Sequence, residues 1–258
     1  MKIGAQMYTV HDLTKTTEGI SECLKKIADI GYKSVQVSGT CKYEPEWLKE
    51  ELDKNGLACD LTHYDMGRIS TDTENVIKEH KILGCKYIGI GSMPGIFDEN
   101  KNKSKDIWYD FAEKYLNAAK IMKDNGCYFM YHNHDKEFIE VDGEIAMDYL
   151  MKTFSPDEMG FTLDTYWVKA AGYEPVEWLK KLSGRIPCIH LKDMVILPDG
   201  TKHFAPVGSG LLDFEPIIKA AVDGGTEYAF VEQDNCYGED QFECLKKSFD
   251  YLHSLGLC

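Results

Sequence analysis

Apolar and polar positions follow two different periods along the chain, and segments of the two kinds take turns. Short runs rich in β-branched and aromatic residues predict strands. These runs are Ile3–Tyr8, Ser34–Ser38, Ala58–His63, Tyr87–Gly91, Tyr128–Asn133, Gly160–Asp164, Ile186–Lys192 and Tyr228–Gln233. Longer stretches with apolar residues three and four positions apart predict helices. They lie near Thr16–Ile30, Glu44–Asn55, Thr71–Leu83, Asp106–Asp124, Ile145–Thr153, Pro175–Leu182, Phe214–Asp223 and Asp240–Leu255.

The alternation predicts eight strand–helix units with parallel strands. Several helices are followed by glycine, as at Gly31 and Gly84, which is typical of a left-handed helix end before a short turn. Eight such units favour closure into a (β/α)₈ TIM barrel. An open doubly wound sheet is the alternative, because one sequence does not give the strand order. No Pro- or Ser-rich linker interrupts the chain, so we predict a single domain over residues 1–258.

Composition supports a globular protein and weighs against some partners. Hydrophobic residues make up 43% of the chain and charged residues 28%, a balance that builds a core easily. The formal net charge of −14 disfavours nucleic acid and anionic lipid, because both need a basic surface to bind. No G-x-G-x-x-G or P-loop motif follows the first predicted strand, which weighs against a dinucleotide or nucleoside triphosphate.

Cysteine usage and the chain's N-terminal segment bear on location. The nine cysteines are scattered, odd in number and contain no C-x-x-C pair, which favours a reducing compartment over a disulfide framework or zinc knuckle. The first residues run directly into a strand pattern without a signal-peptide region, and no apolar run is long enough to cross a bilayer. We therefore expect a cytoplasmic protein without membrane contact, and the sequence is compatible with a homo-oligomer.

Polar side chains gather where the predicted strands end. In α/β barrels and open sheets alike, chemistry takes place at this C-terminal edge. The residues at or just after strand ends are Gln6, Tyr8, Gln36, Ser38, His63, His132, Asn133, His134, Asp164, His190, Lys192, Glu232, Gln233 and Asp234. A single histidine at such a place is more often structural than functional, and an Asp after a strand usually caps a helix.

Four consecutive strands, the fifth to the eighth, end in side chains that bind metals. They are His132, Asp164, His190 and Glu232. In a closed barrel these neighbouring ends converge on one cavity. A mixed imidazole and carboxylate set suits one divalent ion of Mn, Zn, Co or Fe, whereas an all-oxygen set would suit Mg²⁺ or Ca²⁺. The sequence thus predicts a metal site.

At these strands the chain resembles the xylose-isomerase-like TIM barrel superfamily of sugar isomerases, epimerases and endonuclease IV-type proteins. The resemblance covers almost the whole chain. Its specific parts are Tyr-His-Asn-His-Asp-Lys-Glu-Phe at 131–138, Leu-Asp-Thr-Tyr-Trp-Val at 163–168, His-Leu-Lys-Asp at 190–193, Val-Gly-Ser-Gly at 207–210 and Val-Glu-Gln-Asp at 231–234. The HNH-x-x-E-F form at 132–138 is similar to a subfamily described as sugar phosphate isomerase/epimerase.

The resemblance implies one catalytic metal held by Glu, Asp, His and Glu from strands five to eight. Three of these positions carry over onto Asp164, His190 and Glu232. The fourth differs, because many members have Glu where this chain has His132. Two hypotheses remain at this stage: His132 replaces the glutamate as ligand, or Glu137 reaches back to the metal.

The same comparison weighs against a nuclease. Endonuclease IV-type proteins carry a histidine three residues after the strand-six Asp, where this chain has Trp167. They also have an Asp-x-His pair after strand seven, whereas here Asp199 and His203 lie four residues apart.

The chemistry implied is removal of a proton next to a sugar carbonyl, through a metal-stabilised enediolate. We predict a metal-dependent sugar or sugar phosphate isomerase/epimerase. The first alternative is a lyase or dehydratase acting on a keto-sugar or keto-inositol with the same metal site. The second is a sugar-binding subunit without enzymatic activity.

Individual roles follow from this interpretation. Glu232 is the first candidate for the catalytic base, with His134 and Glu137 as partners. The substrate-binding candidates are Tyr8, His63, Trp167 and Lys192. The Gly-Ser-Gly at 208–210 is either a phosphate cradle made of backbone N–H groups or simply a flexible loop.

Overall fold

The computed structural model describes residues 1–257, and its centre is a closed barrel of eight parallel strands. The strands are β1 (Lys2–Gln6), β2 (Ser34–Val37), β3 (Ala58–His63), β4 (Tyr87–Ile90), β5 (Tyr128–His132), β8 (Met159–Asp164), β9 (Cys188–Leu191) and β12 (Tyr228–Val231). They stand in this order around the ring, and β1 pairs in parallel with β12 to close it. The predicted (β/α)₈ barrel is confirmed, and the open-sheet alternative is excluded.

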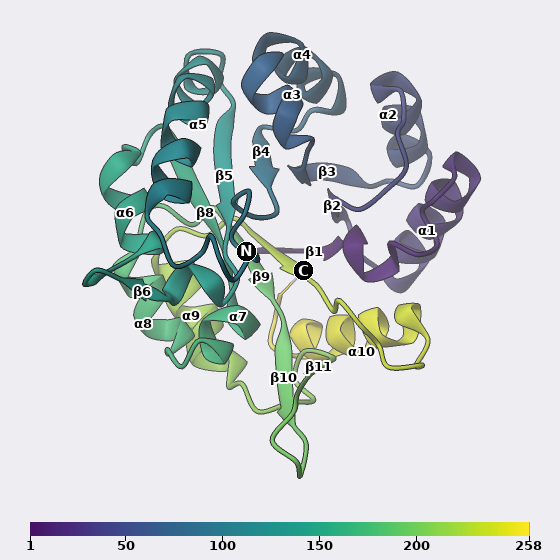
Figure 1. Cartoon of the computed structure of the whole chain (residues 1–258). Coiled ribbons are helices and arrows are strands. Elements are labelled where there is room, and N and C mark those ends of the chain that lie inside the picture. Colours follow the sequence, from purple (N-terminus) through teal and green to yellow (C-terminus); the bar gives the residue numbers. More distant parts are fainter. Residues whose placement is uncertain (258) are drawn as a thin grey trace.

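Helices surround the strands on the outside (Figure 1). They are α1 (Thr17–Ile30), α2 (Pro45–Lys54), α3 (Met66–Thr71), α4 (Thr73–Leu83), α5 (Asp106–Asp124), α6 (Ala146–Thr153), α7 (Thr165–Ala170), α8 (Pro175–Lys181), α9 (Phe214–Asp223) and α10 (Gln241–Ser254). Helix ends follow the expected chemistry: Gly84, with φ of 72°, donates its N–H to the carbonyls of His80 and Lys81. Among the described residues no helix combines the length and hydrophobicity needed to span a bilayer.

Several short elements were not predicted from the sequence. Short 3-10 helices form at Met7–Val10 and Lys136–Phe138, and two hairpins are added, β6 (Glu140–Val141) with β7 (Glu144–Ile145) and β10 (Asp193–Ile196) with β11 (Lys202–Ala205). The β10–β11 hairpin projects beyond the ring of helices (Figure 1). These elements lie in the loops, where hydrophobic periodicity carries little information.

The barrel interior changes from apolar to polar along the strands. A buried apolar group inside the barrel comprises Leu61, Tyr87, Met130, Cys188 and Phe230. Strand side chains alternate between the two faces, so the residues two positions further along share the inward face. On four of these five strands the rule places a polar side chain directly beyond the apolar group, namely His63, His132, His190 and Glu232. The fold thereby builds a polar chamber at the C-terminal end of the barrel.

Candidate active site

The four residues predicted as metal ligands come together in this chamber. Their donor atoms all lie within 4.8 Å of one another, and all four residues are buried. His132 Nε2 lies 3.3 Å from Asp164 Oδ2, and His190 Nδ1 lies 2.9 Å from Glu232 Oε2. The strand register explains the convergence, because Asp164 pairs with His190 across β8 and β9. Four donors of this mixed type at these distances are suited to one divalent cation.

Hydrogen bonds outside the group orient both imidazoles. Nδ1 of His132 lies 2.9 Å from the carbonyl oxygen of Gly91, and Nε2 of His190 lies 2.6 Å from Oε1 of Gln36. Both partners are acceptors, so each ring can keep its proton on the outer nitrogen. The nitrogen that faces the group would then offer its lone pair to a bound cation, as metal coordination requires.

Two buried atoms of the group face each other without a well-formed hydrogen bond between them. His190 Nδ1 and Glu232 Oε2 lie 2.9 Å apart, and the other contact of Glu232 Oε2 is its ion pair with Lys192. Buried polar atoms are almost always paired, so such atoms need an explanation. A shared cation would satisfy both, and the residues present thus fit a divalent metal.

Asp164 has two roles in the structure. Its Oδ1 accepts the N–H of Trp167 at 3.0 Å and caps α7, while its Oδ2 faces the two imidazoles. The backbone N–H of Asp164 donates to the side-chain oxygen of Asn133. The helix-cap explanation and the ligand explanation of this residue therefore hold together, one for each carboxylate oxygen.

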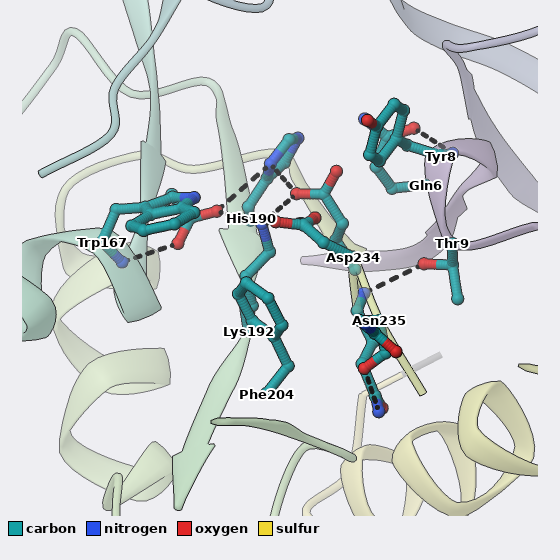
Figure 2. A network of polar contacts seen from close by, with 12 residues as sticks. Gln6, Tyr8, Thr9, Trp167, His190, Lys192, Phe204, Asp234 and Asn235 are labelled. Atoms are coloured by element: carbon teal, nitrogen blue, oxygen red, sulfur yellow. Dashed lines mark hydrogen bonds and ion pairs between the residues drawn. The ribbon is translucent and has the colours of Figure 1, made fainter. Parts of the chain in front are cut away.

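Lys192 is a buried cation among three carboxylates. Its Nζ lies 2.7 Å from Glu232, 2.9 Å from Asp234 and 3.1 Å from Asp164. Figure 2 shows it extending from the end of β9 beneath His190 and beside Asp234. Burial alone would lower the pKa of Lys192, but the carboxylates raise it well above its ordinary value. Lys192 therefore remains protonated and is a hydrogen-bond donor rather than a base.

Burial and the charges in the chamber determine the protonation states of Glu232, His63 and His134. Burial would raise the pKa of Glu232, but Lys192 and His190 lower it well below its ordinary value, so its carboxylate stays ionised. Burial lowers the pKa of His63 and of His134 well below 6.5; neighbouring histidines lower it further, and Glu232 opposes the effect. Both histidines are therefore neutral near pH 7, and each presents one nitrogen without a hydrogen-bond partner.

A cavity of about 830 Å³ opens above the chamber. Of the predicted substrate-binding residues, Tyr8, His63 and Lys192 line it, but Trp167 does not. The Trp167 ring packs against His134, with ring centroids 5.1 Å apart, and borders Lys192. Trp167 therefore packs against two residues of the chamber, and its contact with a substrate stays a prediction.

Glu137 lies outside the cavity and outside the four-residue group. It is fully buried, and its two oxygens accept hydrogen bonds from the Tyr131 hydroxyl at 2.7 Å and from the His134 backbone N–H at 2.9 Å. The group within 4.8 Å contains His132 in its place. This geometry favours His132 over Glu137 as the fourth donor and gives Glu137 contacts that hold the loop carrying His134.

The Gly-Ser-Gly loop does not offer a phosphate cradle. The N–H groups of Gly208 and Gly210 both donate to Oδ2 of Asp193, at 3.0 and 2.7 Å. Asp193 Oδ1 accepts two further backbone N–H groups, from Met194 and Leu212. A carboxylate of the protein thus fills the place proposed for a phosphate, and its hydrogen bonds tie the loop to the start of β10.

Three contributions to the site were not predicted. Asp234 was noted at a strand end, and the period-two rule from Glu232 would have shown that it faces the same way. The role of Gln36 follows only from its contact with His190 across the barrel, which the sequence does not show. Phe97, which lines the cavity with its edge against the His134 ring, lies in a long irregular loop where the sequence gives no signal.

The fold and the polar group define a class of protein, a TIM barrel with an enzyme-like site at the C-terminal ends of its strands. Within that class the chain belongs to the xylose isomerase-like TIM barrel family, whose model matches residues 24–255. This family includes sugar-modifying enzymes, and the resemblance seen in the sequence is confirmed.

Several curated relatives are named inosose dehydratase. An inosose dehydratase from Serratia proteamaculans is 26% identical over 266 residues, covering 90% of this chain and 88% of the relative. One from Lacticaseibacillus casei is 24% identical over 255 residues, covering 86% and 85%. One from Geobacillus kaustophilus is 25% identical over 193 residues, or 67% of this chain, which spans only 61% of that relative.

Solved structures are similar over nearly the whole chain. A sugar phosphate isomerase/epimerase from Parabacteroides distasonis superposes with a TM-score of 0.79 at 25% identity, covering 98% of this chain and 93% of the other. An L-ribulose 3-epimerase gives a TM-score of 0.77 at 14% identity, covering 100% and 95%. At that lower identity the likeness shows the fold alone.

Proposed function

We propose that this protein is a metal-dependent enzyme that isomerises or epimerises a sugar by removing a proton next to a carbonyl. The observation that carries the proposal is the buried group of His132, Asp164, His190 and Glu232 at the floor of an open cavity. The P. distasonis structure supports the same reaction class. The substrate is a small molecule, and neither nucleic acid nor membrane takes part.

Each residue of the site has its own role in the proposed reaction. A divalent cation, held by the four donors, would stabilise the negative charge that develops on the carbonyl oxygen. Glu232 lines the cavity as an ionised carboxylate and takes the proton from the neighbouring carbon. Lys192, which stays protonated, donates a hydrogen bond to a substrate oxygen. His134, neutral and with a free nitrogen, is the partner that exchanges a proton on the opposite side.

Dehydration is the second candidate, and the relatives named inosose dehydratase favour it. Loss of a β-hydroxyl begins with the same proton abstraction and needs one acid for the leaving oxygen. His132, where many family members have a glutamate, also removes the symmetry of a glutamate pair that would exchange the proton on both faces of the sugar. A non-enzymatic sugar-binding subunit would keep the cavity but perform neither reaction.

The test is solvent deuterium exchange with a panel of keto-sugars and keto-inositols, using protein loaded with Mn²⁺. We expect deuterium in the product, and we expect Glu232→Gln to reduce the rate by at least ~10²–10⁴-fold, the usual contribution of a general base. Product mass separates isomerisation, which leaves it unchanged, from dehydration, which lowers it by one water. Metal content is measured in both proteins, and Glu137→Gln is the control for a buried glutamate outside the cavity.

Wild-type turnover by a metal-loaded Glu232→Gln protein would assign the base to another residue. Complete absence of exchange and product across the panel would favour the binding-subunit alternative.

A further inference from the structure

We infer that the substrate of this site is an uncharged sugar or cyclic polyol and not its phosphate ester. The inference rests on the proposed function and narrows its substrate class. Phosphate recognition in proteins relies on arginine, on lysine, or on free backbone N–H groups at loops and helix N-termini. In this chain each of these is committed elsewhere or outweighed by acidic groups.

Both arginines of the sequence have structural partners. Arg68 on α3 makes ion pairs with Asp72 and Glu79, each at 2.8 Å. Arg185 donates to three backbone carbonyls at 2.9–3.0 Å, beside the start of β8. Within residues 1–257 the cavity lining contains no arginine. The residue best suited to bidentate phosphate binding is therefore absent from this lining.

Several backbone N–H groups of the loops at this end of the barrel are also occupied. Phosphate sites in TIM barrels are often formed by the loops after strands seven and eight and a nearby helix N-terminus. Here the loop after the β10–β11 hairpin gives its N–H groups to Asp193. After β12, Oδ1 of Asp240 accepts the N–H groups of Phe242 and Glu243 and caps α10. The chain's own carboxylates stand where phosphate oxygens would bind.

The remaining charge in the cavity is negative. Lys192 is the single lysine among the described lining residues, and three carboxylates surround it. The lining also includes Asp12 and Asp234. A divalent cation in the four-residue group would add two positive charges, and with Lys192 these still fall short of the carboxylates of Asp12, Asp164, Glu232 and Asp234. A dianionic phosphate would enter against this excess.

Uncharged side chains in the cavity lining can form hydrogen bonds with sugar hydroxyl groups. They are distributed around the wall of the cavity and comprise Tyr8, Ser38, Ser92, Asn235 and Gln241. Such groups both donate and accept, as sugar hydroxyls do. The lining therefore matches a neutral polyol better than an anion.

The experiment compares equilibrium binding of free sugars and their phosphates to the Mn²⁺-loaded protein by calorimetry. The pairs are D-fructose, D-tagatose and D-ribulose, each with its terminal phosphate ester, together with a free keto-inositol. We expect at least one free sugar or keto-inositol to bind, and every ester to bind roughly tenfold or more weakly than the tightest free compound. Tighter binding of any ester than of its free sugar would overturn the inference, as would binding of no free compound.

A charge reversal on the lining provides a matched pair of variants. Asp12→Lys changes an exposed carboxylate at the cavity, and Glu22→Lys makes the same change on the exposed face of α1. Asp12→Lys should narrow the difference between sugar and ester by roughly threefold or more, and Glu22→Lys should leave it unchanged. Equal effects of the two variants would contradict the argument from cavity charge. Solvent deuterium exchange is measured separately. Binding of a free sugar without deuterium exchange would contradict only the proposed reaction. Deuterium exchange together with tighter binding of an ester would contradict only the inference about the substrate.

Discussion

Gln36 offers a sharp test of how the chamber prepares a metal site. Its Oε1 lies 2.6 Å from Nε2 of His190, and both side chains are buried. The contact holds the ring proton on Nε2 and leaves the Nδ1 lone pair facing Asp164 and Glu232. Gln36→Leu keeps a similar volume but removes the acceptor. The buried Nε2–H then loses its partner, and the tautomer with the proton on Nδ1 becomes competitive.

The magnitude follows from the value of that hydrogen bond. A neutral hydrogen bond contributes about 1 kcal/mol, and a buried donor left unpaired costs about 1–3 kcal/mol. Loss of an outer partner of a metal-binding histidine typically lowers metal affinity by about 10–100-fold, equivalent to about 1.4–2.7 kcal/mol. We therefore expect Gln36→Leu to raise the dissociation constant for Mn²⁺ or Zn²⁺ by roughly tenfold to a hundredfold.

The assay is competition for the metal with a fluorescent chelator, at constant pH. Gln233→Leu is the matched control, because Gln233 is also buried, directly follows Glu232, and donates to the Asn235 carbonyl rather than contacting a candidate ligand. An unchanged metal affinity in folded Gln36→Leu protein, or an equal loss in both variants, would refute the proposed role of Gln36.

Two further predictions concern the fourth donor and acid stability. His132→Ala should lower metal affinity by roughly tenfold or more, while Glu137→Gln should not; elemental analysis after dialysis against limiting metal checks this, and the reverse order would restore Glu137 as the ligand. His80 is buried between Val76 and Thr62, and burial lowers its pKa to about 4. The neutral form is favoured on folding, so its contribution is complete above pH 6.5 and is lost as the pH falls towards 4. Over that window the free energy of unfolding should fall by about 3 kcal/mol more in wild type than in His80→Gln, measured by urea titration; identical pH profiles would contradict it.

The sequence determined the barrel and the inner face of its site, for a local physical reason. Strands and helices differ in the period of their apolar residues, and all eight barrel strands lie within or close to the predicted segments. The period of two then sets which side chains point inward, so His132, Asp164, His190 and Glu232 could be expected to meet once the strands were known to be neighbours.

Only the tertiary structure decided between alternatives that depend on distant partners. Asp193 accepts the N–H groups of Gly208 and Gly210 because the β10–β11 hairpin brings the chain back to it. No local sequence pattern predicts that hairpin. Trp167 lies in the first turn of α7, which Asp164 caps, and its ring packs against His134 and Lys192 rather than lining the cavity. Glu137 is separated from the group by its own contacts with Tyr131 and His134. In each case a hydrogen bond or a packing contact made by a loop sets the outcome, and loop geometry is fixed by long-range contacts that a periodic pattern does not contain.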